Sequence, residues 1–489
     1  MTSNNNTART FHTNNVAASQ QQEHKAKNLP YNYNFEKMIE KQDEMKENIK
    51  LRELNIDLDQ VLKNYEQYIQ IDQEYEQVQY LRKEIAEYLA GKRTSEQVPI
   101  EIKNLIKEDL ENKKADSWKV IGKEFKTKIQ NLEKIKNEVY QELCEKTVKL
   151  PNFTEEGVMK FSKENSNQPN LVKYVGEKKE TIPKLSHYEI CEKLDLFEPA
   201  NECSGSKFFF LKNEGVLLEV ALQNFAISKL LKRGFKIIMP PELMKQSIVE
   251  GCGFQPRGEH SQIYRIENSN QEPTTTKNGE TCNDSLCLIG TSEIGLAALH
   301  CNEFMPNFKG PLKYAGLSHC FRTEAGAAGS KDRGLYRVHQ FTKVEMFVYC
   351  EPEQSEALLD EIVSIQEEIF SELGFHFQIL DMPCNDLGNP AFRKIDMEAF
   401  IPSRLGYGEV SSASNCTDYQ SRKLNIRYRS NNTTVYPHTL NGTAMAVPRA
   451  IITILENNQF YDENGKLGVK IPKPLVPFML SGQDVIMEK

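Results

Sequence analysis

One stretch of the chain gathers unlike functional groups between two apolar runs typical of strands. It covers residues 321–347, FRTEAGAAGSKDRGLYRVHQFTKVEMF. Arg322 and Glu324 alternate with uncharged neighbours, so a strand would present both charges on one face, where each needs a partner. A cross-strand ion pair would explain such a pair in isolation, and the glycine-rich loop at 326–334 could simply mark turns. The combination is more informative than either part.

The same stretch closely resembles motif 2 of class II aminoacyl-tRNA synthetases, in the form peculiar to seryl-tRNA synthetases. Further segments resemble signatures of that family, in the family's order and spacing: RVHQF at 337–341, TSE at 291–293, EVSSASNCTDYQSRK at 409–423 and NGTAMAVPRAIITILENNQ at 441–459. Pro241, at the end of GFKIIMPP, resembles the motif 1 proline of the family's dimer interface. The likeness covers roughly residues 35–480, far more than a chance tripeptide match.

The resemblance implies a two-step reaction on ATP, L-serine and tRNA(Ser). The chain would form seryl-adenylate and pyrophosphate, and would then transfer the seryl group to the 3′ end of the tRNA for translation. Serine's carboxylate is already ionised at pH 7, so it can attack the α-phosphorus of ATP without a general base. Catalysis is then mainly positioning and charge neutralisation. The family's catalytic positions correspond to Arg322, Glu409 and Arg449.

The resemblance also implies how ATP is held. Phe341 would stack beneath the adenine with Arg449 above it, and Glu324 would orient the base. Glu409 and Ser412 match the positions that hold Mg²⁺ on the phosphates, and oxygen ligands are what this hard ion requires. The implied ATP-binding residues are Arg322, Thr323, Glu324, Val338, Phe341, Glu409, Val410, Ser411, Ser412 and Arg449.

Selection of serine is expected from side chains that bind its hydroxyl group. The serine-binding residues implied by the resemblance are Thr291, Ser292, Glu293, Arg322, Glu345, Asn441 and Thr443. Such a pocket leaves buried polar groups unpaired when alanine enters, which can reject alanine by roughly 10⁴ or more, while threonine lacks room for its methyl group. Any one of these residues alone would more often be a cap or an ordinary buried hydrogen bond. The order of the motifs favours the pocket.

Motif 3 departs from many family members, which carry small residues, often glycine, where this chain has residues 443–445 and Pro448. Because Thr443 keeps a hydroxyl group, we expect the serine contact to survive. Pro448 restricts the backbone just before Arg449. The chemistry is therefore expected to be intact.

The elements that must position these residues belong to a predicted α+β catalytic domain at 185–489. Short β-branched and aromatic runs alternate irregularly with helical stretches, which indicates a mainly antiparallel sheet flanked by helices. The predicted strands are 208–211, 236–239, 344–349 and 424–428, and the predicted helices are 217–233, 353–373 and 450–457. Residues 151–184 are predicted to form a linker, and 267–284 a surface insertion.

Residues 35–150 are predicted to form an antiparallel helical hairpin, a coiled-coil arm. Apolar residues step by three or four in two runs, which are Ile71, Tyr75, Val78, Leu81, Ile85, Tyr88 and then Trp118, Ile121, Phe125, Ile129, Leu132, Ile135, Val139, Leu143. Gly91 and a polar stretch with Pro99 permit a reversal between them. Residues 78–140 hold 14 Lys or Arg against 11 Asp or Glu, a local charge of +3. A solvated coiled-coil surface would explain this mixture alone, but beside the synthetase motifs we expect the arm to bind tRNA through phosphate, ribose and shape.

Two other hypotheses compete with a serine-activating enzyme. A synthetase-derived binding protein that has lost activation should have a broken Arg322, Glu345, Glu409 or Arg449, and none is broken. A class II synthetase for another amino acid should lack the helical arm and the TSE and RVHQF runs, which are present. The sequence therefore favours the seryl enzyme over both.

Composition and the N-terminus limit where the protein works. The net charge is 61 minus 69, or −8, so the whole chain is no general polyanion binder, and no run approaches the ~20 apolar residues that a bilayer requires. The 11 cysteines lack a CxxC pair, which fits a reducing compartment, and Cys282 and Cys287 lack the other ligands that zinc needs.

The first 22 residues contain no Asp or Glu, so 1–34 would be a disordered tail or a mitochondrial transit peptide. The AGAAGSKDRGLYRVHQF and AVPR variants resemble those of mitochondrial seryl-tRNA synthetases of eukaryotes. We therefore expect the protein in the mitochondrial matrix, with the cytoplasm as the alternative.

Overall fold

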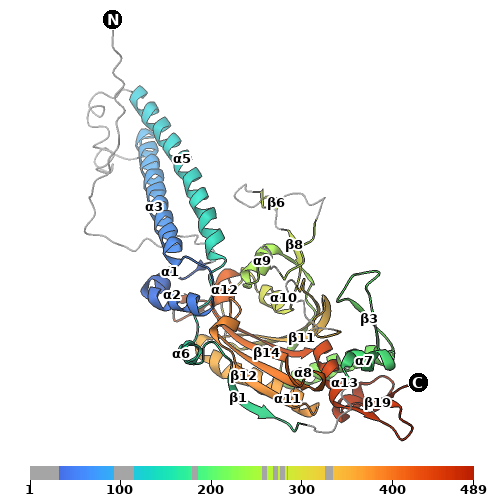
Figure 1. The fold of residues 1–489 in the computed structure, drawn as a ribbon. Coiled ribbons are helices and arrows are strands. Elements are labelled where there is room, and N and C mark those ends of the chain that lie inside the picture. Colours follow the sequence, from blue (N-terminus) through green and yellow to red (C-terminus); the bar gives the residue numbers. More distant parts are fainter. Residues whose placement is uncertain are drawn as a thin grey trace. The chain divides into compact units, whose positions relative to one another are not determined.

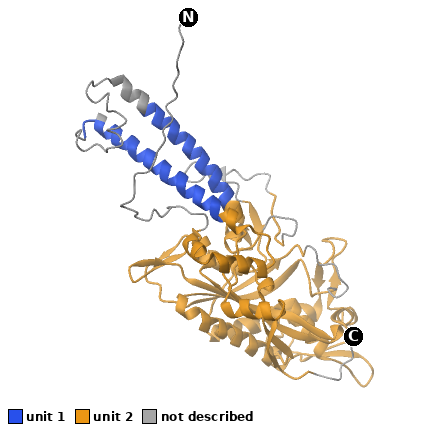
Figure 2. Cartoon of the chain, turned by 60° about the vertical axis from the view of Figure 1, so that its left-hand side comes forward, with its two compact units in different colours: residues 1–29, 62–143 blue, residues 30–61, 144–489 orange. Residues whose placement is uncertain are grey.

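The computed structural model describes residues 32–92, 115–178, 185–255, 262–267, 274–275, 281–282, 285–324 and 334–489 (Figure 1). Nearly all of the predicted N-terminal tail, the stretch around Pro99, Gly326 and Gly329 of the motif 2 loop, and most of the predicted insertion at 267–284 lie outside these ranges. The chain divides into two compact units, one holding residues 62–143 with 1–29 and the other holding 30–61 with 144–489 (Figure 2).

The order of elements is mixed along the chain. The helices are α1 (Phe35–Glu40), α2 (Gln42–Leu51), α3 (Leu58–Leu89), α5 (Ala115–Thr147), α6 (Glu156–Glu164), α7 (His187–Lys193), α8 (Asn213–Lys232), α9 (Gln246–Gly251), α10 (Glu293–Ala298), α11 (Ser355–Glu372), α12 (Tyr419–Lys423) and α13 (Val447–Asn457), with 3-10 turns η3 (Pro352–Gln354), η4 (Cys384–Asp386), η5 (Pro402–Arg404) and η6 (Lys473–Phe478). The strands are β1 (Asn170–Val175), β2 (Phe197–Pro199), β3 (Phe209–Leu211), β4 (Lys236–Ile238), β5 (Leu243–Lys245), β6 (Thr274–Thr275), β7 (Thr281–Cys282), β8 (Leu286–Leu288), β9 (Phe304–Met305), β10 (Leu312–Phe321), β11 (Gln340–Cys350), β12 (Phe377–Asp381), β13 (Arg393–Ile401), β14 (Gly406–Thr417), β15 (Arg427–Ser430), β16 (Thr433–Val435), β17 (His438–Ala446), β18 (Gln459–Tyr461), β19 (Leu467–Lys470) and β20 (Val485–Met487).

The first unit is built on the two long helices α3 and α5, which pack side by side (Figure 2). Val78 of α3 is buried against Ile129 and Leu132 of α5. Nearer the start of α3, the ring of Tyr68 lies 5.6 Å from that of Tyr140 near the end of α5. Because contacts move down one helix as they move up the other, the pair is antiparallel, as the two apolar stripes and the break near Gly91 predicted.

The second unit is organised by a sheet of eight described strands in the order β1-β12-β13-β14-β17-β11-β10-β4. All neighbouring pairs are antiparallel except β10 and β4, which are parallel. The predicted α+β class with a mainly antiparallel sheet is confirmed. The predicted strand at 424–428 was partly wrong, because α12 ends at Lys423 and β15 begins only at Arg427.

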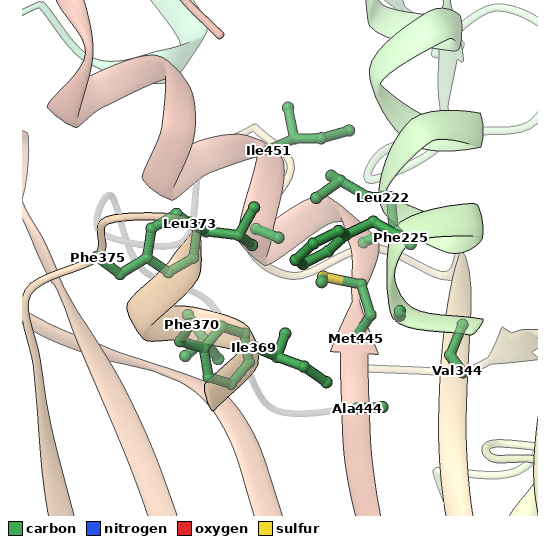
Figure 3. Packing of buried hydrophobic residues seen from close by; sticks show 14 of the residues in the cluster. Leu222, Phe225, Val344, Ile369, Phe370, Leu373, Phe375, Ala444, Met445 and Ile451 are labelled. Atoms are coloured by element: carbon green, nitrogen blue, oxygen red, sulfur yellow. The ribbon is translucent and has the colours of Figure 1, made fainter. Parts of the chain in front are cut away.

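The main hydrophobic core lies between this sheet and the helices α8, α11 and α13 (Figure 3). Leu222 and Phe225 of α8 and Ile451 of α13 meet Val344 and Met445 of the central strands there. The opposite face of the sheet carries α10. Alternation along β11 divides its side chains between the two faces, so Lys343 and Glu345 fall opposite the core that holds Val344 and Met346.

No helix among the described residues is long and apolar enough to cross a membrane.

Replacing Phe370 of α11 with alanine should lower the free energy of unfolding by about 3–5 kcal/mol, because the lost ring leaves a cavity in the core. Phe370 is 1% exposed, stacks on Phe375 and meets Phe377 edge-on. Urea denaturation followed by circular dichroism measures the loss. Ser364→Ala, on the exposed side of the same helix, is the matched control and should change stability by less than about 0.5 kcal/mol. Equal losses in the two variants would contradict this packing.

Candidate active site

A cleft that encloses about 540 Å³ of space, part of it open to solvent, lies in the second unit. It is lined by Arg322, Glu324, Leu335, Tyr336, Val338, Phe341, Lys343, Glu409, Val410, Ser411, Ser412, Thr443, Ala446, Pro448 and Arg449. The structure thus brings together every residue predicted to be catalytic and every predicted ATP-binding residue except Thr323. Residues from four separate segments converge here.

A bulge in β14 turns Glu409 and Ser412 toward the cleft together. Residues three apart in a regular strand point to opposite faces. The pairing of β13 with β14 shifts register directly after Glu409, which leaves Val410 as an extra residue. Consequently Val410 and Ala413 both pack in the core, although Val410 also borders the cleft, and Glu409 and Ser412 both line the cleft.

The neighbouring strand β17 carries a second bulge. Its pairing with β11 shifts register across Ala444, and Thr443 and Ala446, also three residues apart, both line the cleft. Because β14 and β17 are adjacent in the sheet, the two bulges act on the same site. Bulges often re-aim side chains in this way beside functional sites.

Arg449 and Glu409 form an ion pair in the cleft. Arg449 Nη1 lies 3.3 Å from the Glu409 carboxylate and donates to the Glu409 backbone carbonyl at 2.9 Å. Burial alone would raise the pKa of the Glu409 carboxyl, but the positive charges of Arg449 and Lys394 hold that pKa below its usual value. The Glu409 side chain is 40% exposed, so a charged carboxylate is accessible from the cleft.

Arg322 lies just beyond the end of β10. The strand ends at Phe321 and Glu324 has a positive φ of 47°, so the two charges do not alternate within a strand, and that prediction was wrong. They reach the same cleft because the chain turns there. The Arg322 guanidinium lies 5.3 Å from the centre of the Phe341 ring, and Glu324 is paired with Arg337 at 3.2 Å. A cation and an aromatic face therefore stand next to each other.

A buried carboxylate adjoins the cleft on β11. Glu345 is 2% exposed, and its carboxylate lies 2.6 Å from Lys343 Nζ. The Thr443 hydroxyl donates to the same carboxylate at 3.0 Å. Lys343 and Thr443 line the cleft themselves. The trio can therefore offer hydrogen bonds to a small polar molecule while the lysine compensates the buried negative charge.

Glu293, the first residue of α10, lies behind this trio. Its Oε1 accepts hydrogen bonds from Asn441 Nδ2 at 2.8 Å and from Gln420 Nε2 at 2.7 Å. Burial raises the pKa of the Glu293 carboxyl to about 7, and the negative charge of Glu345 adds to the rise. Glu293 and Asn441 thus form a second polar group that does not itself line the cleft.

Three predicted site residues, Thr291, Ser292 and Thr323, do not line the cleft. The Thr291 hydroxyl accepts a hydrogen bond from the Glu293 backbone N–H at 3.2 Å, and the Ser292 hydroxyl donates to the Gly316 carbonyl at 3.3 Å. Both therefore support the start of α10. Thr323 follows β10 and is absent from the cleft lining.

Sequence reasoning missed three polar residues of the site. Lys343 precedes Glu345 by two residues, so strand alternation could have placed it on the same face. Gln420 lies within the predicted signature at 409–423, but nothing in the pattern singles it out. Tyr336 lies 4.9 Å below the Arg449 guanidinium and directly precedes the RVHQF run, which was the one available signal.

Because folding raises the pKa of Glu293, ionising this residue destabilises the folded state as pH rises from about 4.5 to about 7. Glu293→Gln has no proton to lose, and its Oε1 can still accept both hydrogen bonds. We expect its free energy of unfolding, relative to the unchanged chain, to improve across that window by up to about 3 kcal/mol. Denaturant unfolding at pH 4.5, 5.5, 6.5 and 7.5 measures the trend. A difference independent of pH would mean that Glu293 titrates normally.

Comparisons with known proteins agree with this site. The family model of the tRNA synthetase class II core domain (G, H, P, S and T) matches residues 264–458. A serine–tRNA ligase of Treponema denticola is 41% identical over 445 residues, covering 89% of this chain and 95% of the relative, and one of Borreliella afzelii is 47% identical over 326 residues, covering 64% and 71%.

Solved structures extend the likeness to the fold. The crystal structure of seryl-tRNA synthetase from Pyrococcus horikoshii complexed with ATP has a TM-score of 0.75 at 30% identity, covering 94% of this chain and all of that one. Cytoplasmic serine–tRNA ligase from Naegleria fowleri in complex with AMP has a TM-score of 0.70 at 25% identity, covering 91% and 96%. With motifs, cleft and relatives in agreement, this chain belongs to the seryl-tRNA synthetase family of class II aminoacyl-tRNA synthetases.

Proposed function

We propose that this cleft forms seryl-adenylate from ATP and L-serine and then passes the seryl group to the 3′ end of tRNA(Ser). Family membership makes the chain a serine–tRNA ligase, and the assignment of each step to particular residues is the proposal. Arg322, Glu409 and Arg449 line one cleft next to the hydrogen-bonded pair of Glu345 and Thr443. That arrangement is the observation on which the proposal rests.

Two guanidinium groups would neutralise the negative charge that the reacting carboxylate and phosphates carry. When the serine carboxylate attacks the α-phosphorus, the phosphate oxygens need positive partners. Arg322 has a planar donor fork suited to both carboxylate and phosphate, and Arg449 would bind the nucleotide with it. Phe341 would give the adenine a stacking surface, and Glu324 would orient the base. The ATP and AMP complexes of the two solved relatives support a nucleotide in this cleft.

Glu409 and Ser412 are the residues that would hold Mg²⁺. The fit is chemical, because a carboxylate kept charged by its cationic neighbours and a hydroxyl group are the hard oxygen donors that this ion prefers. Two protein donors leave the remaining coordination positions to phosphate oxygens and water. When bound, the ion would neutralise charge on the phosphates of ATP.

Glu345 and Thr443 would select serine through its hydroxyl group. The carboxylate already accepts the Thr443 hydroxyl and contacts Lys343, so it is positioned and charge-compensated before substrate arrives. An amino acid without a hydroxyl would leave part of this buried group unsatisfied. Glu293 and Asn441 lie one layer behind and would act through the shape of the pocket.

The helical pair α3 and α5 would bind the tRNA. Its sequence between residues 78 and 140 carries a net charge of +3, although the chain as a whole carries −8. Positive charge on a long helical surface suits phosphate contacts that are largely independent of sequence.

A homodimer through the segment around Pro241 is the expected assembly. Large apolar side chains gather near it in the sequence with unusual exposure, and Met239 alone is 78% exposed. Leu231 of α8 and Leu243 of β5 are exposed as well. Apolar surface of this kind favours a protein partner. Sedimentation equilibrium would test the assembly, and a monomer at micromolar concentration would exclude it.

The mitochondrial matrix is the proposed location, and its support is the acid-free start of the chain together with the resemblance of the AVPR and motif 2 variants to mitochondrial enzymes. The cytoplasm is the alternative. Imaging a tagged full chain beside one lacking residues 1–34 separates the two, because only a targeting segment would change the location on removal.

Serine-dependent ATP–pyrophosphate exchange tests the function itself. We expect exchange with serine and with none of the other nineteen standard amino acids at comparable concentration. Exchange driven by a different amino acid would replace serine in the proposal. Absence of exchange with all twenty would favour a binding protein that has lost activation.

Glu345→Ala should weaken serine activation by at least the ~1–3 kcal/mol that a lost buried hydrogen bond is worth. The exchange assay gives kcat/KM for serine in both proteins. Thr443→Ser is the matched control, since it keeps the hydroxyl that reaches Glu345, and should stay near the unchanged enzyme. Unaltered kinetics of the Glu345 variant would remove this residue from the pocket.

Excising residues 78–140 and joining the ends with a short Gly-Ser linker should leave adenylate formation intact and abolish aminoacylation. The reason is that the cleft residues all belong to the other unit, whereas the basic helical surface is lost. Pyrophosphate exchange and charging of tRNA(Ser) are measured on the same preparation. Normal charging by the shortened chain would refute a tRNA-binding role.

A further inference from the structure

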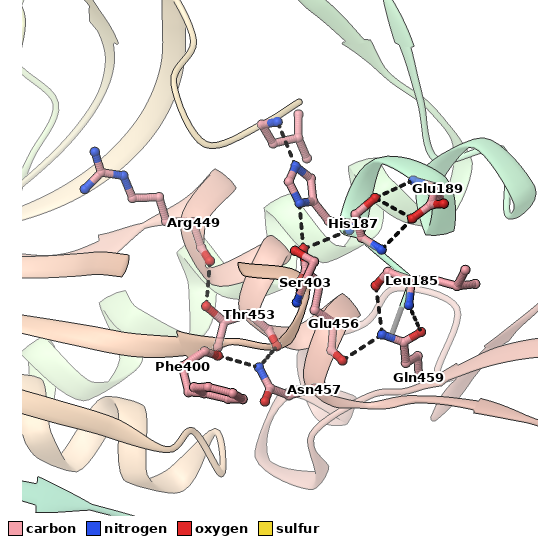
Figure 4. Close-up of polar contacts among 12 residues, drawn as sticks. Leu185, His187, Glu189, Phe400, Ser403, Arg449, Thr453, Glu456, Asn457 and Gln459 are labelled. Carbon is pink, nitrogen blue, oxygen red and sulfur yellow. Dashed lines mark hydrogen bonds and ion pairs between the residues drawn. The ribbon is translucent and has the colours of Figure 1, made fainter. Parts of the chain in front are cut away.

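A buried histidine and glutamate, outside the cleft, connect two of its walls. His187 begins α7 and is 5% exposed, and Glu456 near the end of α13 is fully buried. His187 Nδ1 lies 2.8 Å from Glu456 Oε1, which also accepts the His187 backbone N–H at 2.9 Å. The other carboxylate oxygen accepts the Ser403 N–H at 3.0 Å. Figure 4 shows these contacts between the two helices.

The second nitrogen of the histidine ring has a different partner. His187 Nε2 lies 3.2 Å from the backbone nitrogen of Leu335, whose N–H can only donate. Nε2 must therefore be the acceptor, which places the ring proton on Nδ1, facing Glu456. The carboxylate thus selects the tautomer in which the histidine can hold the Leu335 backbone.

The residues held in this way form one wall of the cleft. Leu335, Tyr336 and Val338 all line it. The ring of Tyr336 lies 4.9 Å below the guanidinium of Arg449 and 3.7 Å from that of Arg404. The backbone that His187 fixes therefore sets the position of an aromatic ring against a nucleotide-binding arginine.

Another part of the cleft lining belongs to the helix that carries Glu456, α13. Arg449 lies in the first turn of α13, seven residues before Glu456, and Thr453 between them donates to the Arg449 carbonyl at 2.9 Å (Figure 4). One rigid helix consequently places Arg449 directly and Leu335 through the His187 ring. The position of Leu335 relative to Arg449 therefore depends on this connection.

The residue before Leu335 must be glycine for His187 to come this close to the backbone. Gly334 has a φ of +75°, and a Cβ atom there would lie 2.3 Å from His187 Nε2. Only glycine combines that backbone conformation with so close an approach of the ring.

We propose that His187 is a positioning residue for ATP, which holds the Leu335–Tyr336 backbone at a fixed distance from Arg449 through its Glu456-selected tautomer. The inference rests on the proposed use of this cleft for ATP. Binding of serine should change little, because Glu345 of β11 and Thr443 of β17 do not contact His187, Glu456 or Leu335.

Two conservative substitutions separate the two bonds of the ring. His187→Gln keeps an acceptor at the place of Nε2 for the Leu335 N–H, whereas His187→Asn keeps only a donor at the place of Nδ1 for Glu456. We expect the asparagine variant to raise KM for ATP about five- to tenfold, the worth of one buried hydrogen bond. KM for serine should stay within about twofold in both variants. The glutamine variant should stay near the unchanged enzyme for ATP.

Gln459→Leu is the matched control for loss of stability. Gln459 joins the segment before α7 to the end of α13 through two hydrogen bonds with the Leu185 backbone, at 3.0 and 3.2 Å (Figure 4), but does not touch Leu335. It should lower Tm without changing KM for ATP. The inference fails if the asparagine and glutamine variants have the same KM for ATP, or if all three variants raise the KM values for ATP and serine in parallel.

The failure of the inference and that of the proposed function can be told apart. Serine-dependent exchange by the unchanged enzyme tests the function, and its absence overturns the proposed function. Calorimetric titration of the same variants with ATP tests the inference independently, because it measures nucleotide binding without catalysis. Weaker ATP binding by the asparagine variant than by the glutamine variant supports the inference, and equal binding overturns it.

Discussion

Ionised side chains on the cleft face of the central sheet must have partners of opposite charge, because an unpaired charge removed from water costs several kcal/mol. On β11, the positive charge of Lys343 compensates the negative charge of Glu345. Arg449 of α13 does the same for Glu409 of β14. Substrates that carry a carboxylate or phosphates can then enter a site whose charges are already arranged. Groups that would be expensive to bury one at a time are tolerated together, and they are oriented before ATP or serine arrives.

The sheet meets this constraint through its two bulges. A regular strand would send Glu409 and Ser412 to opposite faces and would place one of them in the core among Val410 and Ala413. The extra residue in β14 keeps the apolar side chains in the core and both oxygen donors in the cleft. The bulge at Ala444 of β17 does the same for Thr443. Local irregularity of the backbone is therefore what lets one strand serve both the core and the chemistry.

Much of this could be predicted from the sequence where a pattern is periodic or a motif is specific. The stripes around Val78 and Ile129, with the break near Gly91, predicted two helices that pack antiparallel. The motif 2 stretch and the motifs at 409–423 and 441–459 predicted which distant segments meet in the cleft. Bulges could not be predicted, because they depend on the register between two strands far apart in sequence. His187 could not be found either, since a lone histidine at a helix start has no partner in sequence; Glu456 lies 269 residues away.

The departure of motif 3 from its usual small residues has a simple physical account in this fold. Pro448 occupies the first turn of α13, where a backbone N–H has no partner within the helix, so the ring removes nothing that is needed and its fixed φ favours the start of the helix. Arg449 is the next residue, in the first turn of α13, and it lines the cleft. Because Glu456 lies further along the same helix, a proline that defines where α13 begins also defines where both arginine and carboxylate stand. Pro448, which restricts the backbone just before Arg449, is compatible with the geometry of the site for this reason.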